Sequence, residues 1–212
     1  MTALIALLLV LLAATAVLLL QRQQRRLRRA SPPPLETRHL FNLRIGDIVQ
    51  VGAQDWVVED RLLYCQTGGF QWLEYVLQDG SARRWLSVCE DDALEVAWLR
   101  SADLSDLSDR SALSHGAPER LEWRGRPYRR IERGTASVRA DGRVMNQRLG
   151  PCVFADYEAE AGAEGAEGLL ALEWWGGAED PGDDVEISVG ERLDPRLLTF
   201  LPGDGRSVYR QG

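Results

Sequence analysis

Short apolar segments separated by turn residues run through most of this chain, and they restrict its fold more than any other feature. Between residues 41 and 100 they include Asp55–Gln66 (DWVVEDRLLYCQ) and Leu94–Arg100 (LEVAWLR), with stretches of period-two alternation. Runs of this kind, bounded by Gly, Asp and Ser, are typical of antiparallel strands. Two more runs, Gln71–Gln78 and Arg83–Cys89, flank a turn built around an Asp-Gly pair, which predicts a β-hairpin. The sequence therefore predicts a mainly β fold.

A second set of strand-like segments follows the polar stretch 101–119, and its motifs repeat those of the first set. Trp72-Leu73-Glu74-Tyr75 corresponds to Phe154-Ala155-Asp156-Tyr157, and each is followed by a Trp-bearing segment. Similar motifs in the same order indicate a duplicated unit. We therefore predict two similar antiparallel β-meander halves, residues 40–100 and 120–202, arranged as a sandwich or barrel-like fold. A polar linker, 101–119, joins them, and residues 203–212 form a tail.

The N-terminal segment has a different composition. Ala3–Leu20 contains eighteen residues without a charge, which as a helix would span about 27 Å. No basic residue precedes it, so we predict a retained transmembrane anchor, residues 1–21, rather than a cleaved signal. An Arg-rich and Pro-rich juxtamembrane linker, 22–39, follows. Five arginines in this linker lie just after the apolar segment: Arg22, Arg25, Arg26, Arg28 and Arg29. Their position predicts a single-pass protein of the inner (cytoplasmic) membrane with the C-terminal domain in the cytoplasm. They either only fix this topology or also bind anionic lipid headgroups.

Composition excludes several kinds of chemistry. All 25 basic residues are arginine, so lysine-dependent phosphate loops and Schiff-base chemistry are impossible. The two histidines, His39 and His115, are far apart, and the three cysteines lack C-x-x-C spacing. We therefore expect no catalytic, cofactor or metal residues. Residues 30–212 carry 20 arginines against 32 acids, a net charge of −12, which disfavours nucleic acid as a partner.

The stretch Trp72–Val88 (WLEYVLQDGSARRWLSV) places a carboxylate, aromatic rings and arginines around one turn. Its alternation puts Leu73, Tyr75 and Leu77 on one face, where we expect core, and Glu74 on the other. We expect Glu74 to pair across the turn with one of the two arginines at positions 83 and 84. This interpretation makes the stretch an architectural hairpin rather than a catalytic site.

Four motifs follow one another in the first half: RIGDIV (Arg44–Val49), WVVEDRLLY (Trp56–Tyr64), WLEYVLQDG (Trp72–Gly80) and RWLSV (Arg84–Val88). The later segments FADYEAE and LEWW echo them. This order resembles an uncharacterised bacterial family, catalogued as domain of unknown function four-one-seven-eight. The resemblance implies a gene neighbourhood of small membrane proteins and of polyamine-synthase-like or envelope-stress genes, and it supplies no catalytic residues.

Two functions of different classes are consistent with these features. The first is a membrane-tethered, non-enzymatic protein-interaction or regulatory module in membrane or envelope-stress physiology, with a membrane-protein partner. Exposed tryptophans would mark its surface, and Trp98, Trp123 and Trp175 are the candidates. The second is a carboxylate-lined binder of small cations such as polyamines, or an accessory to a polyamine enzyme, in which Glu74 and Asp156 converge. A purely structural accessory role cannot be distinguished from the first by sequence.

Overall fold

The computed structural model describes residues 36–142, 149–160, 167–176 and 185–206. The chain divides into two units, residues 1–37 and residues 38–212, and the second contains all the strands given below. The predicted anchor 1–21 and the five membrane-proximal arginines lie outside the described residues. No helix within the described ranges is long and apolar enough to cross a membrane.

The protein is mainly β, as predicted, and within the described residues its strands form one antiparallel sheet of 11 members. The same residues include three short 3-10 helices between strands, η1 (Leu104–Asp106), η2 (Arg110–His115) and η3 (Pro195–Leu197). The strands are β1 (Ile48–Val51), β2 (Gln54–Gln66), β3 (Gln71–Asp79), β4 (Ala82–Glu90), β5 (Leu94–Ser101), β6 (Arg120–Trp123), β7 (Arg126–Ala140), β8 (Gly150–Ala159), β9 (Leu169–Trp175), β10 (Val185–Arg192) and β11 (Leu198–Leu201).

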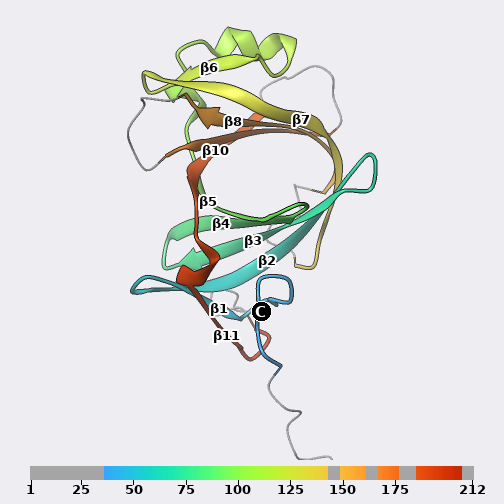
Figure 1. The fold of residues 1–212 in the computed structure, drawn as a ribbon, viewed down its shortest axis with the longest axis vertical. Coiled ribbons are helices and arrows are strands. Elements are labelled where there is room, and N and C mark those ends of the chain that lie inside the picture. The colour runs from blue at the N-terminus through green and yellow to red at the C-terminus, as the bar shows by residue number, and fades with distance from the viewer. Residues whose placement is uncertain (1–35, 143–148, 161–166, 177–184, 207–212) are drawn as a thin grey trace, which may run out of the picture. The chain divides into compact units, whose positions relative to one another are not determined.

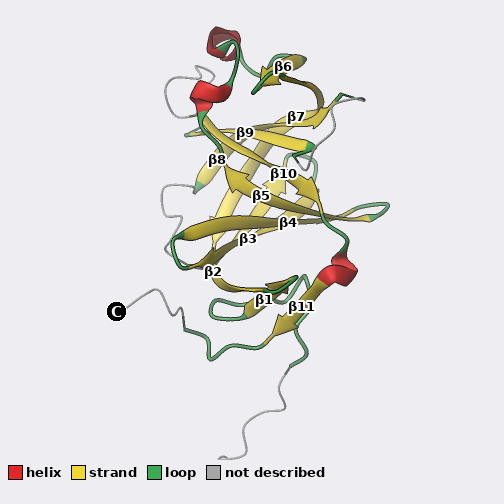
Figure 2. Ribbon diagram, turned by 90° about the vertical axis from the view of Figure 1, so that its left-hand side faces the viewer, coloured by secondary structure: helices red, strands yellow, loops and turns green. Residues whose placement is uncertain are grey.

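Eight of these strands follow one another around a ring. The sheet order runs β2–β3–β4–β5–β10–β9–β8–β7, and β7 pairs again with β2. Figure 1 looks into this ring, with β2–β5 on one side and β7, β8 and β10 on the other. Figure 2 shows that β1 and β11 extend beyond β2 at one end of this unit, while β6 lies beyond β7 at the other.

The ring closes because β2 and β7 are long strands that change partners along their length. The first residues of β2 pair with β1, and Leu62–Gln66 pair with β7. In the same way the first residues of β7 pair with β6, and Ala136–Ala140 pair with β2. Each strand has a register shift between these regions, at Val58/Asp60 and at Arg130/Glu132. Such bulges bend a strand and increase its twist. The bends in β2 and β7 therefore allow the later parts of the two strands to pair with each other and close the ring.

Apolar side chains occupy both faces of the ring wall. One cluster packs β2–β5 against β1, β11 and the segment around Leu40 and Leu43, and another packs β8–β10 against β6 and the linker 101–119. A third cluster fills part of the ring interior and includes Leu62, Tyr64 and Trp85. Alternation along the strands therefore gives two outer cores and one inner core.

The hairpin Gln71–Glu90 forms as predicted, with Leu73, Tyr75 and Leu77 buried in an outer core. The expected pairing of Glu74 with an arginine across the turn does not match the register. Glu74 lies opposite Ser87, whereas the arginines at 83 and 84 lie opposite Gln78 and Leu77. The turn at Gly80-Ser81 lies beyond the end of β3, and strand alternation points Glu74 into the ring interior.

Parts of the fold go beyond the local sequence patterns. The motif RIGDIV enters its strand only at Ile48, because Gly46 adopts a φ of +88° in a turn that Asp47 closes by accepting from the Arg44 amide. β7 is one continuous strand of 15 residues. Strand β11 was not expected, and it pairs with β1. Residues 203–206 of the expected tail pack on the fold, where the Gly203 amide donates to Asp47 at 2.7 Å.

Candidate functional site

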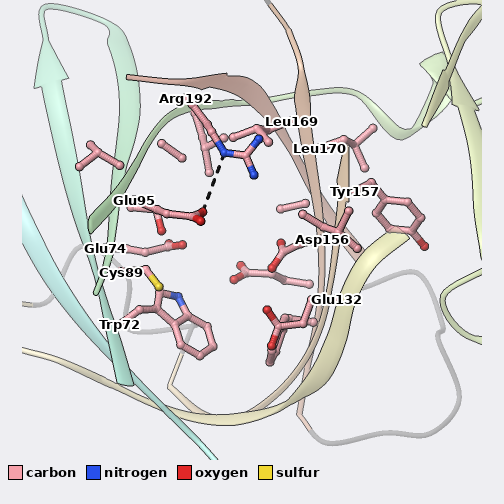
Figure 3. A pocket seen from close by; sticks show the side chains of 18 of the residues that line it. Trp72, Glu74, Cys89, Glu95, Glu132, Asp156, Tyr157, Leu169, Leu170 and Arg192 are labelled. Carbon is pink, nitrogen blue, oxygen red and sulfur yellow. Dashed lines mark ion pairs between the residues drawn. The ribbon is translucent and has the colours of Figure 1, made fainter. Parts of the chain in front are cut away.

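A pocket of about 180 Å³ opens inside the ring and is lined by both sets of strands. We call it the ring pocket; β3, β4 and β5 supply one wall and β7, β8 and β9 the other (Figure 3). Among the described residues, five carboxylates line it: Glu74, Glu95, Glu132, Asp156 and Glu173. Its volume is below the range of about 300–1,000 Å³ that is usual for drug-sized ligands, so the ring pocket suits a small molecule.

Strand alternation explains why these polar side chains point inward. On β3, Leu73, Tyr75 and Leu77 belong to an outer core, so Glu74 projects into the ring. On β8, Ala155 and Tyr157 belong to the other outer core, so Asp156 projects inward from the opposite wall. The structure therefore brings the two sequence-predicted carboxylates into one pocket. Figure 3 shows them pointing into it from opposite sides.

Asp156 has the most perturbed environment in the ring pocket. Its carboxylate forms no hydrogen bond or ion pair with any described residue, although solvent still reaches it through the pocket. Burial, followed by the negative charges of Glu173 and Glu132, raises its pKa from 3.8 to about 7. Glu132 lies directly opposite Asp156 in the β7–β8 register. Close protein packing and neighbouring like charges both disfavour an ionised carboxylate.

Aromatic rings lie beside the carboxylates. Trp72 stacks on Tyr64 with ring centroids 4.7 Å apart and meets Phe154 edge-on at 5.1 Å. The hydroxyl of the fully buried Tyr64 donates to the Glu74 carboxylate at 3.3 Å, which orients that carboxylate within the wall. An apolar and aromatic surface next to carboxylates is suited to alkylammonium groups, because the faces of aromatic rings attract cations.

The outer part of the ring pocket carries its own charges. Arg192 is the one basic side chain among the described lining residues. It forms ion pairs with Glu158 and, at 3.9 Å, with Glu95, and all three side chains are largely exposed. The inner carboxylates thus lie beyond an ion-paired rim. Exposed pairs of this kind contribute about 0–1 kcal/mol and can rearrange.

The carboxylates are spread over the wall instead of converging on a point. Within the described ranges, no three His, Cys, Asp or Glu side chains come close enough to hold a metal ion. Cys89 also lines the ring pocket, and burial raises the pKa of its thiol, which keeps it protonated and a poor nucleophile. The arrangement offers distributed negative charge with aromatic contacts, not a metal cluster.

Of the three tryptophans predicted as interaction residues, Trp123 is buried in an outer core, and the other two do not share a surface. Trp98 is half-buried on an outer core, where it packs edge-on against Trp56 at 5.3 Å. Trp175 is half-buried inside the ring and faces Tyr64 at 6.5 Å. Neither belongs to the residues that line the ring pocket.

Sequence reasoning missed Glu95, Glu132 and Glu173 as members of the site. Glu173 lies in the LEWW segment, which the sequence indicated only as a repeat of the Trp-bearing strand. Period-two alternation along this strand puts Glu173 on the same face as Leu169 and Ala171, so its inward position could have been inferred. Glu132 follows the register shift in β7, and a bulge cannot be located from the sequence pattern alone. Trp72 was assigned an architectural role, and it has one, but it also lines the ring pocket.

Comparison with known proteins places this chain in a family. It is 31% identical over 159 residues to an uncharacterized protein of Mycobacterium bovis and to uncharacterized proteins from two strains of Mycobacterium tuberculosis. These alignments cover 74% of this chain and 70% of each relative. No solved structure matches the chain. The family model for a domain of unknown function (DUF4178) matches residues 44–195, which span the ring from before β1 to η3, and the chain therefore belongs to the DUF4178 family.

Proposed function

We propose that the ring pocket binds small organic cations of the polyamine class, and that the domain acts by binding them and not by catalysis. The observation that carries this proposal is the Asp156 carboxylate, which faces the pocket without a partner among the described residues. A carboxylate held in this way is disfavoured when ionised. A cation bound beside Asp156 would offset the free-energy cost of ionising this carboxylate, and the attraction between the two charges would favour binding.

The remaining wall supports a cation over other ligands. The described lining residues comprise five carboxylates and one guanidinium, and anions would be repelled from such a surface. An alkylammonium ligand would place its charge near Glu74, Asp156 and Glu173 and its methylene groups against Trp72 and Phe154. Because the five carboxylates are spread over the pocket walls instead of clustering at one point, an elongated organic cation fits the distribution of charge better than a metal ion does.

The tethered interaction module predicted from the sequence remains a second proposal, and the two are compatible. An anchor at residues 1–21 would hold the acidic domain at the inner membrane face, with residues 38–212 in the cytoplasm and a membrane protein as partner. Cation binding would then regulate that contact. Membrane fractionation of the full chain and of a variant lacking residues 1–21 tests the tether separately.

The cation proposal is tested by titrating the full chain with butane-1,4-diamine at about 0.15 M salt, where exposed charges are screened over distances beyond about 8 Å. Isothermal titration calorimetry should give saturable binding of one molecule. Asp156→Asn should weaken it by at least about tenfold, since a charged hydrogen bond contributes about 1.5–3 kcal/mol. Asp92→Asn, in the exposed turn between β4 and β5, is the matched control and should bind like the wild type.

Neutral butane-1,4-diol has nearly the same shape as the diamine and should not bind. If the diol binds as well as the diamine, apolar contact and not charge selects the ligand. If both Asp variants bind the diamine equally well, the diamine is attracted by the general acidity of the chain. Either outcome contradicts the proposed site.

A further inference from the structure

The β1–β5 and β6–β10 halves place Glu74 and Asp156 at equivalent register positions. Glu74 lies opposite Ser87 of β4, and Asp156 lies opposite Ala171 of β9. Each follows an aromatic residue by two positions and precedes a buried tyrosine. These two tyrosines act alike: Tyr75 donates to the carbonyl of Leu40 at 2.7 Å, and Tyr157 donates to the carbonyl of Pro118 at 2.8 Å. Each accepting carbonyl lies in the segment before the first strand of its own half, β1 or β6.

The two places where the halves join relate them by an approximate two-fold axis. Leu99 of β5 pairs with Gly190 of β10, and Gln66 of β2 pairs with Ala136 of β7, all in antiparallel strands. Within each pair the two residues occupy the same register position in their own halves. Pairing of equivalent positions is the signature of a two-fold interface. The axis relates the Glu74 wall of the ring pocket to the Asp156 wall.

Resting on the proposed function, we propose that the ligand of the ring pocket is a linear diamine whose two terminal ammonium groups bind one to Glu74 and one to Asp156. The two carboxylates project from opposite walls (Figure 3). Trp72 and Phe154, which also occupy equivalent positions, contact each other edge-on at 5.1 Å. They provide an apolar surface for the methylene chain between the two charges.

A ligand with one charge satisfies this arrangement less well. Its ammonium group would occupy one wall, and its alkyl end would lie beside the carboxylate of the other, where an apolar group gives no charge to offset the desolvation of that carboxylate. The two walls of the ring pocket still differ in charge. Asp156 has Glu132 opposite it on β7, whereas Glu74 has Leu62 opposite it on β2. The Asp156 end therefore carries more negative charge and should contribute more to affinity.

The test compares butane-1,4-diamine with butylamine, which has the same chain and a single charge. Calorimetry on the full chain should show at least about tenfold tighter binding of the diamine, because a second linked contact raises affinity through effective concentration. Glu74→Gln and Asp156→Asn should each abolish this advantage, and Asp92→Asn should keep it. Diamines with three to six carbons should show an optimum length, since the two walls are fixed by the ring.

The outcomes separate this inference from the proposed function. Equal affinity for butylamine and butane-1,4-diamine in the wild-type chain would overturn the diamine assignment and leave the cation site in place. No measurable binding of either amine would overturn both. The wild-type comparison needs no substitution, so it decides the matter even if a variant fails to fold. A steady gain in affinity with chain length, without an optimum, would also contradict the two-wall geometry.

Discussion

Replacing Asp156 with asparagine should stabilise the folded domain at neutral and alkaline pH. The side chain keeps nearly the same shape, but the charge is removed from a pocket where burial, Glu173 and Glu132 raise the pKa of the carboxylate from 3.8 to about 7. Between these two pH values the unfolded chain has an ionised Asp156 while the folded chain keeps it protonated. The wild type therefore loses stability as the pH rises from about 4 to 7, and the asparagine variant does not.

The size of this effect follows from the two pKa values. One pKa unit corresponds to 1.36 kcal/mol. The raised pKa of Asp156 therefore lowers the unfolding free energy of the wild type by about 4 kcal/mol at pH 8 and by about 1.6 kcal/mol at pH 5. These figures are upper limits, because the carboxylate keeps some contact with solvent through the ring pocket. The gain in unfolding free energy should therefore be about 2–4 kcal/mol at pH 8 and less than half of that at pH 5.

Denaturant unfolding of the full chain measures this directly, with tryptophan fluorescence as the signal. The wild type, Asp156→Asn and the exposed control Asp92→Asn are compared at several pH values between about 4 and 8. The difference between wild type and Asp156→Asn should grow with pH, whereas the control should follow the wild type. A variant that is less stable than the wild type at pH 8, or a difference that is independent of pH, would refute the assigned environment of Asp156.

Four further results are expected. Trp85→Ala should lower the unfolding free energy by about 3–5 kcal/mol, because this ring is only 5% exposed in the inner core; an unchanged denaturant midpoint would contradict that burial. Tyr157→Phe should cost about 1–3 kcal/mol by leaving the Pro118 carbonyl without its donor, as measured by the same unfolding assay. Gly190→Ala should cost about 1–3 kcal/mol or more, because a Cβ there would lie 1.9 Å from the Trp98 carbonyl oxygen, whereas Gly168→Ala, which meets no neighbouring atom within 4 Å, should be tolerated. The affinity for butane-1,4-diamine should rise as the pH increases through about 7, since the ionised form of Asp156 binds the cation, and this rise should be absent in Asp156→Asn.

Local patterns in the sequence predict the strands well, because alternation and turn residues act over a few positions. The hairpin around Asp79-Gly80 and the outer-core face of β3 follow from such patterns. Strand β11 could not be expected, because LTFL is four residues long and its partner β1 lies some 150 residues earlier. Nothing local in the chain specifies that pairing.

The candidate site depends on long-range pairing even more strongly. Alternation places Glu74 and Asp156 on the strand faces opposite the outer-core tyrosines, but it does not say whether those faces meet water or each other. The pairing of β2 with β7 and of β5 with β10 decides this, since it folds both faces into one ring. The convergence of Glu74 with Asp156 was proposed from the repeat, whereas the bulge that brings in Glu132 left no sequence signal.

We propose that a small organic cation binds inside the ring between Glu74 and Asp156. A crystal structure of the full chain grown or soaked with butane-1,4-diamine tests it most directly. We expect the diamine in the ring pocket, with its ammonium groups at the two carboxylates and its methylene chain beside Trp72. A well-ordered diamine bound only elsewhere on the acidic surface, with the ring pocket filled by water, would contradict it.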